Sequence, residues 1–108
     1  MASPAKVPSA QYLAFAEDFH SRHPDVEPGS LFGMRCLTRG GKAFLGGFAN
    51  GLVVKLDGQA LAEASAIEGT VPFDPSGAGR PMKAWVVFGP ELREHWERFA
   101  ESAVLTAP

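Results

Sequence analysis

Glycine-rich segments are the first residues of this chain whose types could do chemistry, because such segments can hold phosphate groups. A phosphate-binding loop needs glycines and a lysine at fixed spacing, so that backbone N–H groups and one ammonium group converge on the phosphates. Gly41-Lys42 ends such a pattern, but Cys36 replaces its first glycine and Ala43 its hydroxyl residue. Gly77-Ala78-Gly79 has two glycines of a dinucleotide-binding turn, but it leads into Pro81 and a strand instead of a helix. Neither segment predicts a nucleotide site.

Histidine and cysteine side chains could ligate a metal or act as a base or nucleophile. His20 and His23 are three residues apart at the end of a helical pattern, where they would stabilise the negative helix end, and no third metal ligand is evident. His95 has no identifiable nucleophile for which it could act as a base. The single Cys36 excludes an intramolecular disulfide and favours a buried, inert thiol. We therefore predict no metal site, no cofactor and no catalytic residue.

Two segments concentrate the residues that we select as candidates for binding: Phe32, Gly33, Met34, Gly77, Gly79, Arg80 and Trp85. Strand alternation places Trp85 on the opposite side from Val86 and Phe88, so Trp85 would lie on the more open face of the sheet. A part-exposed tryptophan near an arginine is a common hot spot of protein interfaces. The alternative is that Trp85 covers the glycines of a neighbouring strand and that Arg80 pairs with an acid.

A basic segment is the only feature that favours nucleic acid. Residues 34–56 contain Arg35, Arg39, Lys42 and Lys55 and no acidic residue. The whole chain, however, has a formal net charge of −2 at pH 7, and a nucleic-acid-binding domain usually has a denser basic patch. We expect no useful binding of nucleic acid.

Length and composition limit the architecture. The chain has 108 residues, of which 45% are hydrophobic and 20% charged, which is typical of one globular domain. The apolar runs are too short to span a membrane, and the first ten residues, MASPAKVPSA, do not resemble a secretion signal. We expect a cytoplasmic protein with a flexible arm over residues 1–8, a single domain over residues 9–105 and no membrane contact.

The first half of the chain predicts one helix followed by three strands. Ser9 can cap a helix that Pro24 ends near Arg22, and residues 24–30 read as a loop because they are rich in helix and strand breakers. Residues 34–56 then read as a three-stranded meander with two-residue turns at Gly40-Gly41 and Asn50-Gly51. Its second strand would place Phe44, Gly46 and Phe48 on one face, and Gly46-Gly47 suggests a bulge or a close approach by another group.

The second half predicts a helix, two strands and a final helix. Asp57 can cap the first of these helices, Pro72 places residues 70–74 at a sheet edge or a bulge, and residues 82–88 are apolar enough for the sheet interior. Gly89-Pro90-Glu91 is a good start for the last helix. The apolar faces of these elements predict a core that comprises Phe15, Phe19, Phe44, Leu52, Val54, Leu56, Leu61, Val86, Phe88, Trp96 and Phe99.

This order, α-β-β-β-α-β-β-α, predicts a two-layer α+β fold in which helices cover one face of an antiparallel five-stranded sheet. The third strand of the meander or the Pro72 strand would lie at an edge of the sheet. Exposed edges pair readily, so we include a homodimer among the expected partners.

Several short segments occur in the order and spacing of a known family. They are Leu31-Phe32-Gly33-Met34, Gly41-Lys42-Ala43-Phe44, Gly51-Leu52-Val53-Val54-Lys55-Leu56, Pro72-Phe73 and Gly79-Arg80-Pro81-Met82. Over residues 31–100 the chain resembles the N-terminal domain of the TfoX (Sxy) competence-regulator family, as a stand-alone single-domain member. In that family a Met-Phe-Gly-Gly-like turn, a Gly-Lys-x-Phe strand, a Leu-Tyr-Leu-Lys-like strand and a Pro-Phe loop recur. The resemblance implies the two-layer fold described above and carries over no catalytic residue.

From these observations we expect a non-enzymatic module that binds a protein partner, in a regulatory role related to transcription or competence as the resemblance implies. One alternative is a binding protein for a small ligand or anion, or an enzyme, that uses the loop over residues 72–85. There, backbone N–H groups and the guanidinium group of Arg80 could hold an anion. A second alternative is weak nucleic-acid binding through the basic meander.

Overall fold

The computed structural model describes residues 7–74, 79 and 82–106. Its first helix forms where the apolar spacing predicts it. α1 (Ala10–Arg22) begins at Ser9, whose hydroxyl oxygen accepts a hydrogen bond of 3.0 Å from the backbone N–H of Tyr12. This bond satisfies one of the amide groups that a helix start leaves unpaired. One side of α1 is buried, and the other is open to solvent.

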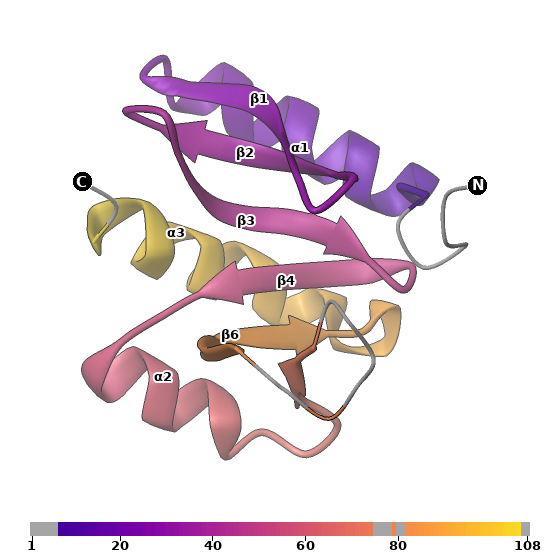
Figure 1. Ribbon diagram of the computed structural model, residues 1–108, viewed down its shortest axis with the longest axis vertical. Helices are drawn as coiled ribbons and strands as arrows, with labels where there is room; N and C mark the ends of the chain where they lie inside the picture. Colours follow the sequence, from indigo (N-terminus) through magenta and orange to yellow (C-terminus); the bar gives the residue numbers. More distant parts are fainter. Residues whose placement is uncertain (1–6, 75–78, 80–81, 107–108) are drawn as a thin grey trace.

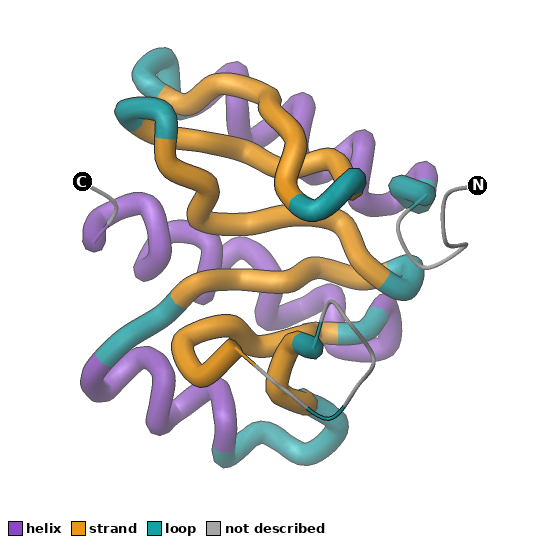
Figure 2. Tube along the Cα trace, in the orientation of Figure 1, coloured by secondary structure: helices purple, strands orange, loops and turns teal. Residues whose placement is uncertain are grey.

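Six antiparallel strands form one open sheet with the order β1-β2-β3-β4-β6-β5. The strands are β1 (Val26–Leu31), β2 (Met34–Arg39), β3 (Lys42–Phe48), β4 (Gly51–Lys55), β5 (Val71–Phe73) and β6 (Met82–Phe88). The α+β class and the antiparallel sheet are therefore confirmed, whereas the predicted count of five strands is wrong. Figure 1 shows the sheet in front of the helices, and Figure 2 marks the same strands in orange.

The additional strand is β1, which occupies the segment predicted to be a loop. Pro28 and Gly29 are strong breakers inside a sheet, but β1 lies at the edge, where a proline is tolerated. Val26 is fully buried and anchors the strand against α1, while most of the remaining side chains of β1 are exposed or partly exposed. One buried residue was too weak a signal to predict this strand.

The two predicted turns of the meander have different outcomes. Gly40 and Gly41 both have positive φ angles and connect β2 to β3, as predicted. The turn between β3 and β4 is formed by Ala49 and Asn50, with φ angles of 52° and 65°, and not by Asn50-Gly51. Gly51 instead lies in β4, where a Cβ atom would collide with the backbone of Phe88. Its lack of a side chain therefore serves strand packing.

A bulge in β3 overturns the predicted shared face of Phe44, Gly46 and Phe48. Leu37 is paired with Leu45 and Thr38 with Ala43, so Phe44 is an extra residue in the ladder. Phe44 and Leu45 consequently both join the core under the helices, whereas Phe48 packs on the opposite side of the sheet.

Three helices cover one face of the sheet. α2 (Gly58–Ser65) follows Asp57, as predicted, although the Asp57 side chain makes no capping hydrogen bond. Pro90 begins a 3₁₀ helix (Pro90–His95) that continues into α3 (Trp96–Thr106). All residues of the predicted core pack between the helices and this face; Phe15 and Leu61 are partly buried there and the other nine are buried. In the part of the chain that is described, no helix is both long and apolar enough to cross a membrane.

The other face of the sheet carries a second apolar cluster of Met34, Val53, Phe73, Trp85 and Val87. Val53 and Phe73 are fully buried, so this face of the sheet is less open to solvent than the position of Trp85 led us to expect. β4 lies between β3 and β6, which corrects the expectation that it could form an edge. β5 is an edge strand and has a register shift at Pro72-Phe73, in agreement with the prediction from Pro72.

Candidate functional site

The tip of the hairpin formed by β1 and β2 is a two-residue turn of Phe32 and Gly33. Leu31 and Met34 are the last paired residues, and Phe32 and Gly33 have φ angles of 51° and 81°. Two consecutive positive φ angles define a type I′ turn, in which asparagine, aspartate or glycine is preferred at the first position. A phenylalanine in this left-handed region is uncommon and strained. Its side chain is nevertheless 47% exposed, so it adds little to the packing of the domain.

A shallow groove of about 600 Å³ lies beside this turn. Val7, from the segment before α1, lines it together with Gly33, Met34 and Arg35 from the hairpin. Val7 is 56% exposed, and Arg35 is also exposed. An exposed aromatic side chain, an apolar groove and a guanidinium group therefore lie at one end of the molecule.

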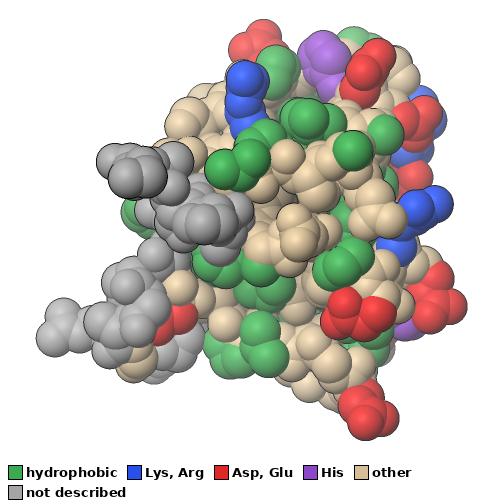
Figure 3. Space-filling view, turned by 90° about the vertical axis from the view of Figure 1, so that its right-hand side faces the viewer, with side chains coloured by type: hydrophobic (Ala, Val, Ile, Leu, Met, Phe, Trp, Pro, Cys, Tyr) green, Lys and Arg blue, Asp and Glu red, His purple; other side chains and the backbone are tan. Residues whose placement is uncertain are grey.

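Figure 3 views this end of the molecule. Hydrophobic side chains gather over the middle of the view, whereas most of the acidic and basic side chains lie toward its right-hand side, over the helices. A surface that combines apolar area with a few charged groups at its border is typical of sites where proteins bind one another.

Trp85 does not form part of an exposed surface, which corrects the prediction of a part-exposed tryptophan. It lies on the face opposite the helices, as predicted, but only 6% of it is exposed. Its ring centroid is 6.2 Å from that of Phe73, which in turn packs edge-on against Phe48 at 4.9 Å. Phe73 from the short edge strand packs against the tryptophan, and Phe48 at the end of β3 packs against Phe73. Strand alternation alone could not predict these long-range neighbours.

The structure brings only some of the predicted binding residues together. Met34 and Trp85 share the second apolar cluster, but both are buried. Gly79 is exposed and its N–H donates a hydrogen bond of 2.8 Å to the Asp74 carboxylate. Gly77 and Arg80 lie outside the described residues. Phe32, Gly33 and Gly79 are therefore the described candidates that remain accessible, and only Phe32 and Gly33 among them are adjacent.

The residues considered for metal or nucleophilic chemistry have structural partners. His20 Nδ1 is 2.5 Å from the carbonyl oxygen of Val26, and His23 Nε2 is 2.5 Å from the carboxylate of Glu101, so the two imidazoles contact different elements. Cys36 is buried, and burial raises the pKa of its thiol. Among the described residues, no three histidine, cysteine or acidic side chains are grouped as a metal ion would require.

The four basic residues of the meander do not form one patch. Arg35 lies in β2 next to the Phe32-Gly33 turn, at one end of the sheet. Lys42 begins β3 and Lys55 ends β4, both at the other end of the sheet. The guanidinium group of Arg39 is 2.8 Å from Asp25 and also donates to the carbonyl oxygen of Val104 at 2.6 Å. The positive charge of Arg39 is therefore involved in contacts within the domain.

Sequence reasoning identified Phe32 and Gly33 but missed the groove next to them. Val7 and Arg35 are far apart in the chain, and Val7 belongs to a segment without any periodic pattern. The chain matches no protein-family model, no curated protein and no solved structure. The resemblance to the TfoX N-terminal domain thus stays a prediction.

Proposed function

We propose that this protein is a non-enzymatic protein-interaction module that binds its partner through the tip of the β1–β2 hairpin. The observation that carries the proposal is Phe32, which is both strained and exposed. A left-handed conformation costs about 1–2 kcal/mol for a residue with a Cβ atom, and the exposed ring recovers little of this cost by burial. Strained residues that do not stabilise the fold are concentrated at functional sites, so the strain at Phe32 favours a role in binding another molecule.

The neighbouring groove indicates the kind of segment that would bind. Phe32 offers a rigid ring, Val7 offers apolar surface, and the exposed Arg35 offers a positive charge. A partner segment with an apolar side chain and an adjacent carboxylate would match these groups. We further propose that the interaction is regulatory and cytoplasmic, as expected for a relative of the TfoX N-terminal domain.

Replacing Phe32 with asparagine tests the proposal because it moves stability and binding in opposite directions. Asparagine before Gly33 is the preferred sequence of a type I′ turn, so F32N should raise the free energy of unfolding by up to about 1 kcal/mol. The same substitution removes the ring and should abolish partner capture. The measurement combines urea denaturation with quantitative mass spectrometry of proteins retained from lysate of the host by the immobilised domain.

Leu13→Gln is the matched control. Leu13 is 46% exposed, close to the 47% of Phe32, but it lies on α1 and does not line the groove beside the hairpin tip. A specific partner is retained by the wild type and by L13Q and lost by F32N. If F32N retains the same proteins as the wild type, the hairpin tip is not the binding site.

A further inference from the structure

The sheet splits between β3 and β4 at the end opposite the hairpin tip. The pairing of these two strands ends at Leu45 and Val54. Beyond this pair the two strands separate. β3 remains paired with β2, where Ala43 is opposite Thr38, and the chain after β4 remains next to β6, where the N–H of Leu56 donates to the carbonyl oxygen of Ala84 at 2.7 Å. Figure 1 shows the two strands diverging, with the C-terminal turns of α3 behind the gap.

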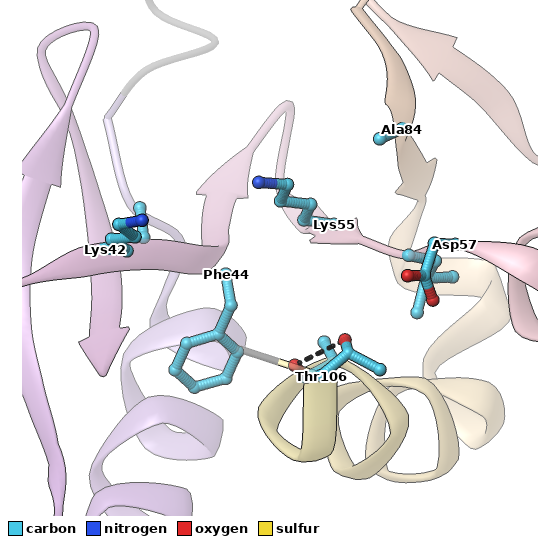
Figure 4. A pocket seen from close by; sticks show the side chains of 9 residues that line it. Lys42, Phe44, Lys55, Asp57, Ala84 and Thr106 are labelled. Atoms are coloured by element: carbon cyan, nitrogen blue, oxygen red, sulfur yellow. Dashed lines mark hydrogen bonds between the residues drawn. The ribbon is translucent and has the colours of Figure 1, made fainter. Parts of the chain in front are cut away.

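This gap opens into a cavity of about 270 Å³. Phe44, Leu56 and Ala103 supply apolar surface, and Thr106 closes the side of α3. Lys42 and Lys55 stand on the two strands that border the gap, with Phe44 and Thr106 below them in Figure 4. The volume is slightly below the range of about 300–1,000 Å³ that is usual for ligand pockets, so a small molecule fits and a nucleotide does not.

The charges around the cavity favour a single negative charge on that molecule. Neither Lys42 nor Lys55 makes an ion pair with another described residue. Two of the carbonyl groups in the last turn of α3, which would otherwise repel an anion, already accept hydrogen bonds: Val104 from Arg39 at 2.6 Å, and Ala103 from the Thr106 hydroxyl at 3.1 Å. Asp57 is the acidic side chain among the lining residues.

We propose that this cavity binds a small organic carboxylate whose apolar body lies on Phe44 and Leu56. The ammonium groups of Lys42 and Lys55 would hold the carboxylate, since charge-assisted hydrogen bonds are the stronger ones. Asp57 disfavours an anion with more than one charge, and the apolar floor disfavours a fully hydrated inorganic ion. The site uses none of the residues of the hairpin tip.

Titration of the ¹⁵N-labelled domain with benzoate tests this assignment, with benzyl alcohol and inorganic phosphate as comparison ligands. Benzoate should shift the amide signals of Lys55, Leu56 and Asp57, and should bind more tightly than either comparison ligand at neutral pH. In the double variant K42Q/K55Q the benzoate affinity should fall about three- to tenfold, the loss expected for two exposed ion pairs. D57N should strengthen benzoate binding because it removes the repelling charge.

The double variant R93Q/R98Q is the control, since it removes two positive charges elsewhere on the surface. Arg93 and Arg98 are exposed and do not line this cavity. Equal losses of affinity in the two double variants would overturn the proposal, as would signal changes confined to other parts of the domain. Phosphate binding as tight as benzoate binding would also overturn it. F32N should bind benzoate as the wild type does, so this result and that of the hairpin experiment can be separated.

Discussion

The ring of Tyr12 lies directly on the backbone of Gly47. A Cβ atom at position 47 would stand 2.7 Å from Cγ of Tyr12, closer than carbon atoms approach in folded proteins. Tyr12 is 1% exposed and belongs to the core between α1 and the sheet. Gly47 thus allows α1 to pack closely against β3. This close packing explains why a buried position of β3 is occupied by glycine and not by a residue with an apolar side chain.

Gly47→Ala should destabilise the domain by about 1–3 kcal/mol, the usual cost of adding a methyl group to a packed core. Urea denaturation followed by circular dichroism measures the change. In a Tyr12→Leu background the same substitution should cost much less, because the ring that causes the collision is absent. Equal costs in both backgrounds would show that the two residues are not coupled.

The hydroxyl group of Tyr12 is buried and has no hydrogen-bond partner among the described residues. Burial raises the pKa of this phenol well above its ordinary value. A raised pKa in the folded state means that its contribution to stability is complete below the ordinary pKa and is lost as the pH rises above it. The chain has one tyrosine, so the ultraviolet absorbance of tyrosinate reports this residue alone.

We therefore expect the tyrosinate band to appear only at a pH well above 10.0, the ordinary value for tyrosine, and together with unfolding. Tyr12→Phe should be neutral or stabilising at neutral pH, since it removes an unpaired polar group. The variant should also tolerate alkaline pH better than the wild type. A loss of stability in Tyr12→Phe at neutral pH would show that the hydroxyl group is hydrogen-bonded.

Local signals in the sequence were sufficient for the helices, the interior strands and the core. The Ser9 cap, the Gly40-Gly41 turn and the burial of Leu52 and Val54 in the core follow from neighbouring residues, and each is found as predicted. The bulge at Phe44 could not be predicted in the same way, since it depends on how β3 matches β2. The glycines at positions 46 and 47 indicate that β3 can contain a bulge, but they do not indicate which residue forms it.

The candidate site was harder to predict than the fold, because exposure depends on distant segments. Trp85 alternates with Val86 in the expected way, but its burial depends on Phe73 from the edge strand. Phe32 was selected for its motif, whereas its strained turn required knowledge that β1 exists and pairs with β2. Because residues 24–30 were predicted to be a loop, the turn at Phe32 could not be predicted.

Trp85→Ala should cost about 3–5 kcal/mol, as expected when a large core side chain is truncated. Trp96→Ala should cost a similar amount, since Trp96 is fully buried and its indole N–H donates to the carbonyl oxygen of Gly89 at 3.2 Å. Denaturant titration of both variants measures the two faces of the sheet separately. A small effect for Trp85→Ala alone would mean that the second apolar cluster contributes little to stability.

The domain should be monomeric, because both edges of the sheet carry a proline. Pro28 lies in β1 and Pro72 in the three-residue strand β5. Proline cannot donate to a further strand, and short edge strands also limit pairing. The expected homodimer depended partly on an exposed β4, which is interior.

Light scattering at increasing concentration should therefore give the mass of one chain, 11.5 kDa. Pro28→Val restores an N–H group and a good strand-forming side chain to β1, and should increase self-association. Pro28→Ser, which restores the N–H group with a weaker strand former, should have a smaller effect. Dimers of the wild type would contradict the predicted monomer. Equal masses of the wild type and Pro28→Val at every concentration would show that this proline does not limit pairing at the β1 edge.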